Sequence, residues 1–113
     1  MLVLGAGGVS RAAIAGLRRL GLANITLTNR RKERAEALCN EFGLLCAPWE
    51  ERGDVPADLI INTTPLGMTG AQEHETPYPR AFQDNGIAYD LIYTPFQTRF
   101  LRDAAAAGWE TVS

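Results

Sequence analysis

The chain has 113 residues, a length that fits one domain with a single hydrophobic core. Its composition, 46% hydrophobic and 21% charged residues, is typical of globular proteins, and no apolar run approaches the roughly 18 residues of a membrane-spanning helix. The net charge of −2 argues against a nucleic-acid surface, which would carry a clustered basic excess. The sequence shows no signal-peptide pattern, so we expect a protein of the cytoplasm. Cys39 and Cys46 lack metal-ligand spacing and are expected to be reduced thiols, with no metal bound.

Strand-like and helix-like stretches alternate from the first residue onward. The apolar run at residues 1–5 predicts a buried strand. From Ala13 to Leu20, small and apolar residues recur at the i, i+3, i+4, i+7 spacing of an amphipathic helix. Residues 24–29 are rich in β-branched side chains and predict a second strand. The same helical spacing returns at residues 35–42 and predicts a helix that Gly43 ends.

The second half of the chain continues this alternation with one interruption. Further strands are expected at residues 44–49, 58–64, 86–93 and 110–113. A helical stripe at 101–108 predicts a third helix, and the acidic stretch 50–54 predicts a turn. Residues 65–84 hold three of the six prolines, so we expect a loop there, with at most a short helix at 79–83.

Strands that alternate with amphipathic helices predict right-handed βαβ units. The expected fold is therefore α/β: a Rossmann-like, doubly wound parallel sheet in a three-layer αβα arrangement, with strand order 3-2-1-4-5 and a sixth strand at the C-terminal side. The first and last residues both fall inside strand-like runs, and chains usually fray beyond their terminal elements. We therefore expect residues 1–113 to be one domain excised from a longer protein.

A glycine-rich turn, "VLGAGGVSRAA" at residues 3–13, separates the first strand from the first helix. In this architecture the turn lies at the carboxyl edge of the sheet, beside the change in strand order. Gly5 suits a tight turn, Gly7 lets a phosphate approach the backbone, and Ser10 is small enough for close helix–strand contact, with a hydroxyl that reaches an anion or a free N–H. The N–H groups of the helix N-terminus favour an anion. The turn predicts a pyrophosphate-binding site, although a glycine turn without a ligand stays open on the motif alone.

The second strand ends in "NRRK" rather than in a carboxylate. Domains that bind NAD usually place Asp or Glu at this position, against the ribose hydroxyls of the adenosine. Asn29 is neutral and would not repel a 2′-phosphate, while Arg30 or Arg31 would bind that phosphate with its planar guanidinium. Three cations at a helix start are unfavourable without an anion, although a solvated helix start is the alternative. The pattern predicts NADP rather than NAD.

Residues at the tips of the fourth and fifth strands are candidates for the nicotinamide end of the cofactor. At the fourth strand and in the loop after it they are Asn62, Thr63, Thr64, Pro65 and Met68, with strand-end capping and loop packing as the alternatives; at the fifth strand they are Tyr93, Thr94 and Pro95.

Reduction of a ketone also needs a proton donor, and the chain supplies no convincing one. The Tyr-x-x-x-Lys arrangement is absent, His74 is expected at the surface, and Asp90 is expected to be buried and structural. We therefore predict a cofactor site with no catalytic residue in this chain.

Four blocks of sequence together resemble the NADP-binding domain of the shikimate dehydrogenase family. In chain order they are "VLGAGGVSRA", "NRRKERAEAL", "DLIINTTPLGM" and "YDLIYTPFQTRFLRDA". The blocks are spread over nearly the whole chain and are far more specific than the glycine turn alone. The resemblance implies NADPH-dependent reduction of 3-dehydroshikimate to shikimate, in aromatic amino-acid and chorismate biosynthesis.

The resemblance also implies roles for individual residues. Gly7, Gly8 and Val9 would lie along the pyrophosphate, and Asn29 and Arg30 would contact the 2′-phosphate. Where the family commonly has Thr after this pair, the chain has Arg31, which suits a phosphate. Tyr93 would lie on the substrate side.

The family's catalytic Lys–Asp pair belongs to an N-terminal substrate domain, and its C-terminal glycine-methionine-glutamine segment returns to the substrate cleft. Neither is present, so the resemblance implies a small-molecule substrate shared with a further domain, and an isolated chain without activity.

Three alternatives stay open at this point. A paralogue acting on quinate or another polyol acid, often with NAD, would share the fold, and the arginines argue only against NAD. A non-catalytic module that senses NADP would need no substrate domain. A methyltransferase also uses a glycine turn but usually has a carboxylate where this chain has Asn29.

Overall fold

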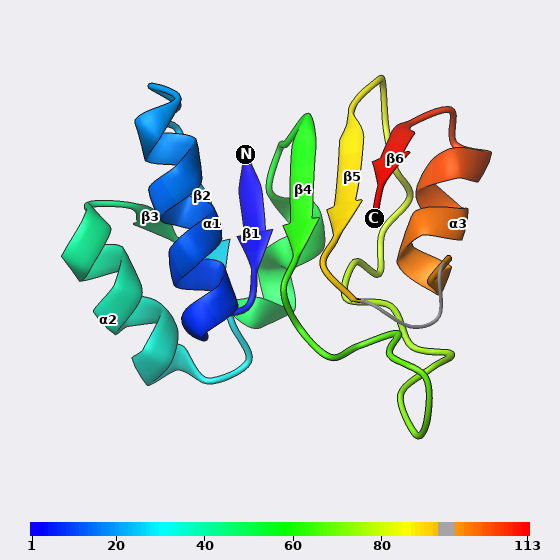
Figure 1. Ribbon diagram of the computed structural model, residues 1–113, viewed down its shortest axis with the longest axis horizontal. Helices are drawn as coiled ribbons and strands as arrows, with labels where there is room; N and C mark the ends of the chain where they lie inside the picture. The colour runs from blue at the N-terminus through cyan, green and yellow to red at the C-terminus, as the bar shows by residue number, and fades with distance from the viewer. Residues whose placement is uncertain (93–96) are drawn as a thin grey trace.

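The computed structural model describes residues 1–92 and 97–113, which form a six-stranded, all-parallel sheet flanked by helices (Figure 1). The elements in chain order are β1 (Leu2–Leu4), α1 (Gly8–Arg19), β2 (Thr26–Thr28), α2 (Lys32–Phe42), β3 (Leu45–Cys46), the 3-10 helix η1 (Trp49–Asp54), β4 (Leu59–Asn62), β5 (Ile87–Asp90), α3 (Arg99–Ala106) and β6 (Glu110–Val112). The strand order β3-β2-β1-β4-β5-β6 confirms the predicted Rossmann-like topology.

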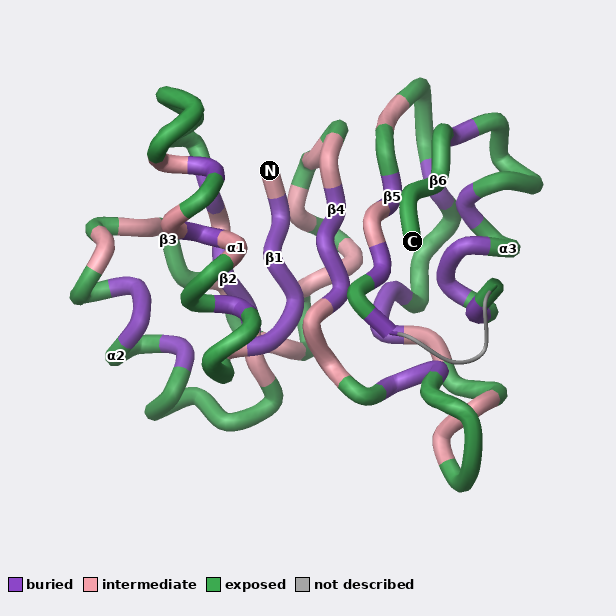
Figure 2. The backbone as a smooth tube through the Cα atoms, viewed as in Figure 1, coloured by how far each residue is buried: buried purple, intermediate pink, exposed green. Residues whose placement is uncertain are grey.

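Alternate residues of the central strand β1 supply two separate hydrophobic cores. Val3 packs with Ile14 of α1 and Leu38 of α2 on one face of the sheet. Leu2 and Leu4 point to the other face, into the core that holds residues of α3. All three residues of β1 are fully buried, so this strand is covered on both sides, as parallel strands usually are (Figure 2).

The segment 65–84 contains no helix among its residues, including the stretch 79–83, yet it contributes to the core. Tyr78 and Phe82 are buried against the face that α3 covers, with ring centroids 4.9 Å apart. The Phe82 ring also meets the edge of Trp109 at 5.0 Å. The aromatic side chains of this loop therefore cover the face of the sheet, as a crossover helix does in regular βαβ units.

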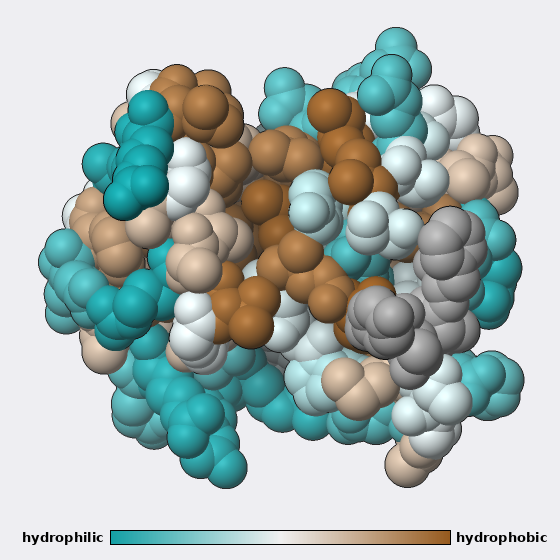
Figure 3. All heavy atoms as spheres, viewed as in Figure 1, coloured by the Kyte–Doolittle hydropathy of each residue, from teal (hydrophilic) through white to brown (hydrophobic). Residues whose placement is uncertain are grey.

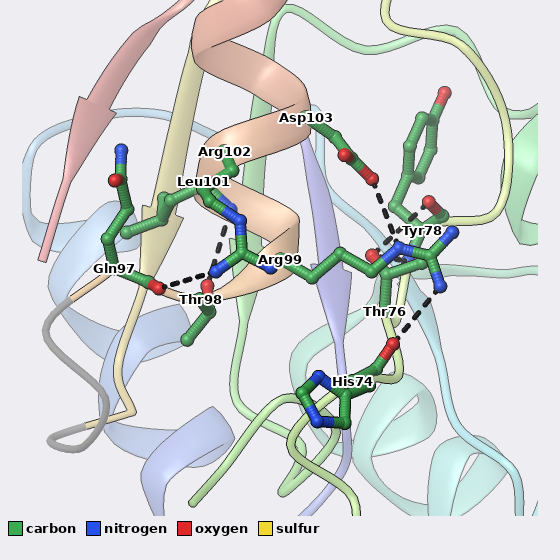
Figure 4. A network of polar contacts seen from close by, with 9 residues as sticks. All are labelled: His74, Thr76, Tyr78, Gln97, Thr98, Arg99, Leu101, Arg102 and Asp103. Carbon is green, nitrogen blue, oxygen red and sulfur yellow. Dashed lines mark hydrogen bonds and ion pairs between the residues drawn. The ribbon is translucent and has the colours of Figure 1, made fainter.

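Arg99 at the start of α3 anchors the same loop (Figure 4). Its Nη1 donates a hydrogen bond of 3.1 Å to the carbonyl oxygen of His74, and its Nε lies 3.6 Å from Oδ2 of Asp103. His74 itself is exposed, as expected from the sequence.

Two local predictions were wrong. The acidic stretch 50–54 belongs to the 3-10 helix η1 instead of a simple turn, and the third strand is reduced to Leu45–Cys46. Both cysteines are free. Among the described residues, no helix has the length and hydropathy that a membrane span requires.

On the face that carries α1, an apolar groove of about 460 Å³ runs between this helix and strands β4 and β5 (Figure 3). It is lined by residues such as Val9, Leu20, Ile61 and Leu91. Right-handed crossovers explain its position: α1 and α2 cover the β1–β3 half of this face, and α3, which follows β5, packs on the opposite face.

Candidate functional site

A hollow of about 450 Å³ lies at the carboxyl edge of the sheet, where the chain turns away from β1, β2, β3 and β4. Most of the residues that the sequence singled out for a cofactor meet here. The hollow is lined by Gly5, Ala6, Gly7, Asn29, Arg30, Arg31, Arg34, Trp49, Thr63, Thr64, Pro65, Leu66 and Gln72. It lies next to the point where the strand order reverses, which is where doubly wound folds place their ligand sites.

Gly5 is required by the backbone on two counts. Its φ of +110° lies in the region that residues with a side chain avoid. A Cβ at this position would also lie 2.2 Å from Oγ1 of Thr63, whose hydroxyl donates a hydrogen bond of 2.7 Å to the carbonyl oxygen of Leu4. The glycine therefore lets β1 and β4 end side by side.

Gly7 and Gly8 are different, because a Cβ at either position would meet no atom within 4 Å. Packing within the chain therefore does not explain why side chains are missing there. Gly7 is the N-cap residue of α1, no side chain caps this helix, and its first turn carries no acidic residue. The first N–H groups of α1 thus face open space at the hollow, an arrangement that suits an anion.

Ser10 requires a correction. It is fully buried, and its hydroxyl donates a hydrogen bond of 2.7 Å to the carbonyl oxygen of Gly5. The expectation of close helix–strand contact is met, and the hydroxyl bonds to the turn from inside instead of lining the hollow. Val9 is 56% exposed and lines the apolar groove beside α1, not the hollow.

At the end of β2, Asn29 organises the corner between strand and helix. Its Nδ2 donates a hydrogen bond of 3.0 Å to the carbonyl oxygen of Arg31, the N-cap residue of α2. Arg30, Arg31 and Arg34 are exposed and line the hollow, and none of them forms an ion pair with any residue that the structure describes. Three uncompensated guanidinium groups make this corner positively charged within a chain of net charge −2.

Sequence reasoning did not select Arg34, Trp49 or Gln72. A signal for Arg34 was present, because a residue three or four positions after Arg30 and Arg31 lies on the same face of a helix. Trp49 follows the short strand β3, and the sequence placed it at the end of a longer strand. Gln72 comes from the loop 65–84, for which no local pattern gives a direction.

A buried polar network joins the carboxyl ends of β4 and β5, and it corrects the prediction for Asn62. This residue is fully buried. Its Nδ2 donates to Oδ1 of Asp90 at 3.2 Å, and its Oδ1 accepts from the backbone N–H and the hydroxyl of Thr64 at 2.9 and 2.6 Å. Asn62 therefore holds the strand ends in place, and its side chain is not part of the lining of the hollow.

Asp90 is buried, as expected of a structural residue. Its Oδ1 also accepts from the N–H of Ile92 at 2.9 Å, and its Oδ2 accepts from the hydroxyl of Thr98 at 2.7 Å. Thr98 is the N-cap of α3 and accepts from the N–H of Leu101. Burial raises the pKa of the Asp90 carboxyl, and the hydrogen bonds from Thr98, Ile92 and Asn62 act in the opposite direction.

Thr63, Thr64 and Pro65 line the hollow as expected from the sequence. Met68 is 45% exposed and is not part of its lining. The predictions for Tyr93, Thr94 and Pro95 fall outside the described residues.

The family model described as Shikimate / quinate 5-dehydrogenase matches residues 1–53. Among curated proteins, a shikimate dehydrogenase (NADP(+)) of Pelobacter propionicus is 54% identical over 99% of the chain, and one of Oleidesulfovibrio alaskensis is 51% identical over 99%. The chain spans 41% of the length of each of these two relatives.

Solved structures give the same result. The shikimate 5-dehydrogenase of Thermus thermophilus, in complex with NADP(H) and shikimate, matches with a TM-score of 0.85 and 42% identity, over 99% of this chain and 41% of that one. The quinate dehydrogenase of Corynebacterium glutamicum, in complex with NAD, matches with a TM-score of 0.86 and 29% identity, over 98% and 42%.

The sheet order, the glycine turn and the hollow beside the topological switch define a Rossmann-like α/β domain. The chain matches the shikimate / quinate 5-dehydrogenase family over residues 1–53 and is similar over nearly its whole length to relatives named shikimate dehydrogenase (NADP(+)), which confirms the resemblance that the sequence indicated.

We expect substitution by alanine to destabilise the chain strongly at Gly5 and only slightly at Gly7. Gly5→Ala introduces a positive-φ side chain and a clash with Thr63, so we expect the free energy of unfolding to fall by about 2 kcal/mol or more. Gly7→Ala meets open space at φ −102°, so we expect the free energy of unfolding to fall by no more than about 1 kcal/mol, the usual cost of alanine at an N-cap. Urea unfolding of both variants measures this difference. Equal losses would show that the turn is not constrained as described.

Asp90 accepts hydrogen bonds from the amide of Asn62, the N–H of Ile92 and the hydroxyl of Thr98. Asp90→Asn leaves at least one of these donors without its acceptor, so we expect the free energy of unfolding to fall by about 1–3 kcal/mol. The raised pKa adds a pH dependence. The folded chain keeps the Asp90 proton to higher pH than the unfolded chain, so stability from this group falls as the pH rises from the ordinary Asp value through the folded-state pKa.

The difference in unfolding free energy between wild type and Asp90→Asn should therefore decrease as the pH rises through that interval. Unfolding measured at several pH values tests this expectation, with the exposed Asp58→Asn as the control. A difference that is constant or increases with pH would contradict it.

Proposed function

We propose that the chain is the NADP-binding domain, residues 1–113, of a shikimate dehydrogenase whose complete form reduces 3-dehydroshikimate to shikimate with NADPH. The observation that carries this proposal is the hollow in which an uncapped helix N-terminus and three unpaired arginines lie together. The first of these features suits a pyrophosphate, and the second suits a further phosphate on the ribose. The names of the 54% and 51% identical relatives, which both include NADP(+), support the same cofactor.

In this proposal the residues of the turn bind the bridging phosphates of the cofactor. The open space at Gly7 and Gly8 leaves room for phosphate oxygens beside the first N–H groups of α1, and Val9 follows in the same turn of helix. Gly5 and Ser10 contribute by fixing the path of the backbone. Preorganised N–H donors of this kind bind without further ordering of the chain, which favours affinity.

The corner after β2 selects the cofactor. Arg30, Arg31 and Arg34 would share the 2′-phosphate of the adenosine, and Asn29 fixes the backbone that carries two of them. NADH lacks this phosphate and would leave the guanidinium groups solvated, so it gains little from them. A carboxylate at position 29 would reverse this preference.

The nicotinamide would lie toward Thr63, Thr64 and Pro65 at the end of β4, with Met68 further along the loop. NADPH supplies the hydride, and the described residues of this chain hold and orient it. The acid–base groups of the reaction would come from a substrate domain outside residues 1–113, and Tyr93 would face that substrate. The chain by itself would then bind the cofactor but have no activity, and the complete enzyme would work in the cytoplasm.

A quinate dehydrogenase that uses NAD is the second candidate. It is favoured by the NAD complex of Corynebacterium glutamicum, whose TM-score is as high as that of the NADP(H) complex. The three arginines at the hollow argue against NAD for this chain, whereas the choice between shikimate and quinate depends on the substrate domain.

The cofactor proposal predicts different effects on NADPH and NADH. Arg30→Ala should weaken NADPH binding by about tenfold, because a hydrogen bond to a charged group contributes about 1.5–3 kcal/mol and part of this is lost at an exposed site. NADH binding should change less than about twofold. Titration of the 113-residue chain with each nucleotide gives both values.

Arg19→Ala is a matched control, because Arg19 is an exposed arginine at the opposite end of α1. It should leave both affinities unchanged. Equal losses of NADPH and NADH affinity in Arg30→Ala would exclude a 2′-phosphate contact at this position.

A further inference from the structure

Trp49 has no role in the site as described so far, yet it occupies a central position. It begins η1, directly after β3, and it is half-buried. It lines the hollow at the glycine turn and also a second hollow of about 500 Å³ beside β3. Asn29 and Arg30 also line both hollows. The indole therefore lies between two cavities at the positively charged corner.

Two arginines approach the Trp49 ring. The guanidinium carbon of Arg52 lies 3.9 Å from the ring centroid, and that of Arg30 lies 5.9 Å from it. Both distances fall within the range of cation–π attraction, for which tryptophan is the strongest partner among the aromatic residues.

Arg52 is fixed in place by the backbone. Its Nε donates a hydrogen bond of 2.6 Å to the carbonyl oxygen of Pro77, and its Nη1 donates one of 2.8 Å to that of Trp49. Burial and the nearby charge of Arg30 lower the pKa of Arg52 below its ordinary value. Arg52 thus holds the indole against the loop at residue 77, and its Nε and Nη1 donate to the backbone.

Arg30 is in the opposite situation. It is exposed, and it has no hydrogen bond or ion pair with the described part of the chain. An arginine side chain loses considerable rotamer freedom when it is ordered. An aromatic face can order a guanidinium without neutralising its charge and without occupying its N–H donors, whereas a carboxylate partner would do both.

We propose that Trp49, held by Arg52, is a positioning residue that directs the Arg30 guanidinium to the hollow and so increases selectivity for a 2′-phosphorylated nucleotide. This inference rests on the proposed NADP-binding function and adds to it the residue that prepares the arginine for the phosphate. Trp49 acts through Arg30, so its effect should depend on that arginine and on the 2′-phosphate.

The test compares adenosine 2′,5′-bisphosphate with 5′-AMP, which differ only in the 2′-phosphate. Their dissociation constants are measured by calorimetric titration of the 113-residue chain in wild type, Trp49→Leu, Trp49→Phe, Arg30→Ala and Trp49→Leu/Arg30→Ala. Trp49→Leu should reduce the preference for the bisphosphate by about two- to fivefold. Trp49→Phe keeps an aromatic face and should restore part of it. In the Arg30→Ala background, Trp49→Leu should cause no further change.

Three results would overturn the inference while wild type still prefers the bisphosphate: an unchanged preference in Trp49→Leu, an equal loss for both nucleotides, or the same loss in the Arg30→Ala background. The second result would mean that the indole contacts adenine directly. A wild-type chain without any preference would instead refute the NADP proposal itself. Thermal unfolding shows whether each variant is folded. If Trp49→Leu does not fold, the same comparison is made with Trp49→Phe and with the double variant Trp49→Phe/Arg30→Ala.

Discussion

The close approach of two strand ends, Gly5 after β1 and Thr63 after β4, is the constraint on which the site depends. In a doubly wound sheet these two strands lead their connections in opposite directions, which opens a crevice between them. Here the strands end so close together that a Cβ on Gly5 would overlap Oγ1 of Thr63. The hydroxyl of Thr63 bonds to the backbone of β1, and the hydroxyl of Ser10 bonds to Gly5. Helix α1 therefore begins at a fixed point, with its free N–H groups directed to the crevice.

The two ends of the hollow are built by different means. At the glycine turn and at the tips of β4 and β5, side-chain hydrogen bonds are buried and largely internal, as in the set Asn62, Asp90 and Thr98. At the corner after β2, the charged groups are exposed and unpaired within the described chain. A buried network gives rigidity, because leaving any of its members unsatisfied is costly. Uncompensated cations at a surface give attraction for an anion, because their solvated charge is available to it.

Much of this could be predicted from the sequence, because the predictive signals were local. The alternation of strands and helices fixed the topology, and the glycine turn and "NRR" marked two loops that the topology brings together. Besides the 3-10 helix at Trp49–Asp54 and the shortened third strand, the differences between expectation and structure concern side-chain direction. Ser10 and Asn62 lie at the predicted edge, but whether a hydroxyl or amide faces a ligand or the interior depends on neighbours distant in sequence, such as Asp90 for Asn62. Trp49 and Gln72 were missed because a six-residue 3-10 helix is too short to show a hydrophobic period and a long loop has none.

The position of the proposed site separates the binding of a cofactor from the choice between cofactors. The relatives in complex with NADP(H) and with NAD match this chain at nearly the same TM-score, so the backbone fold alone does not indicate which cofactor binds. In the proposed function, discrimination comes from residues outside the sheet: the exposed corner after β2 and the 3-10 helix next to it. In this chain both carry arginine, and of these arginines Arg52 is the one whose Nε and Nη1 donate to the protein, to the carbonyl oxygens of Pro77 and Trp49 in the described structure. The remaining guanidinium groups keep their donors for a ligand, which is the condition for recognising a phosphate.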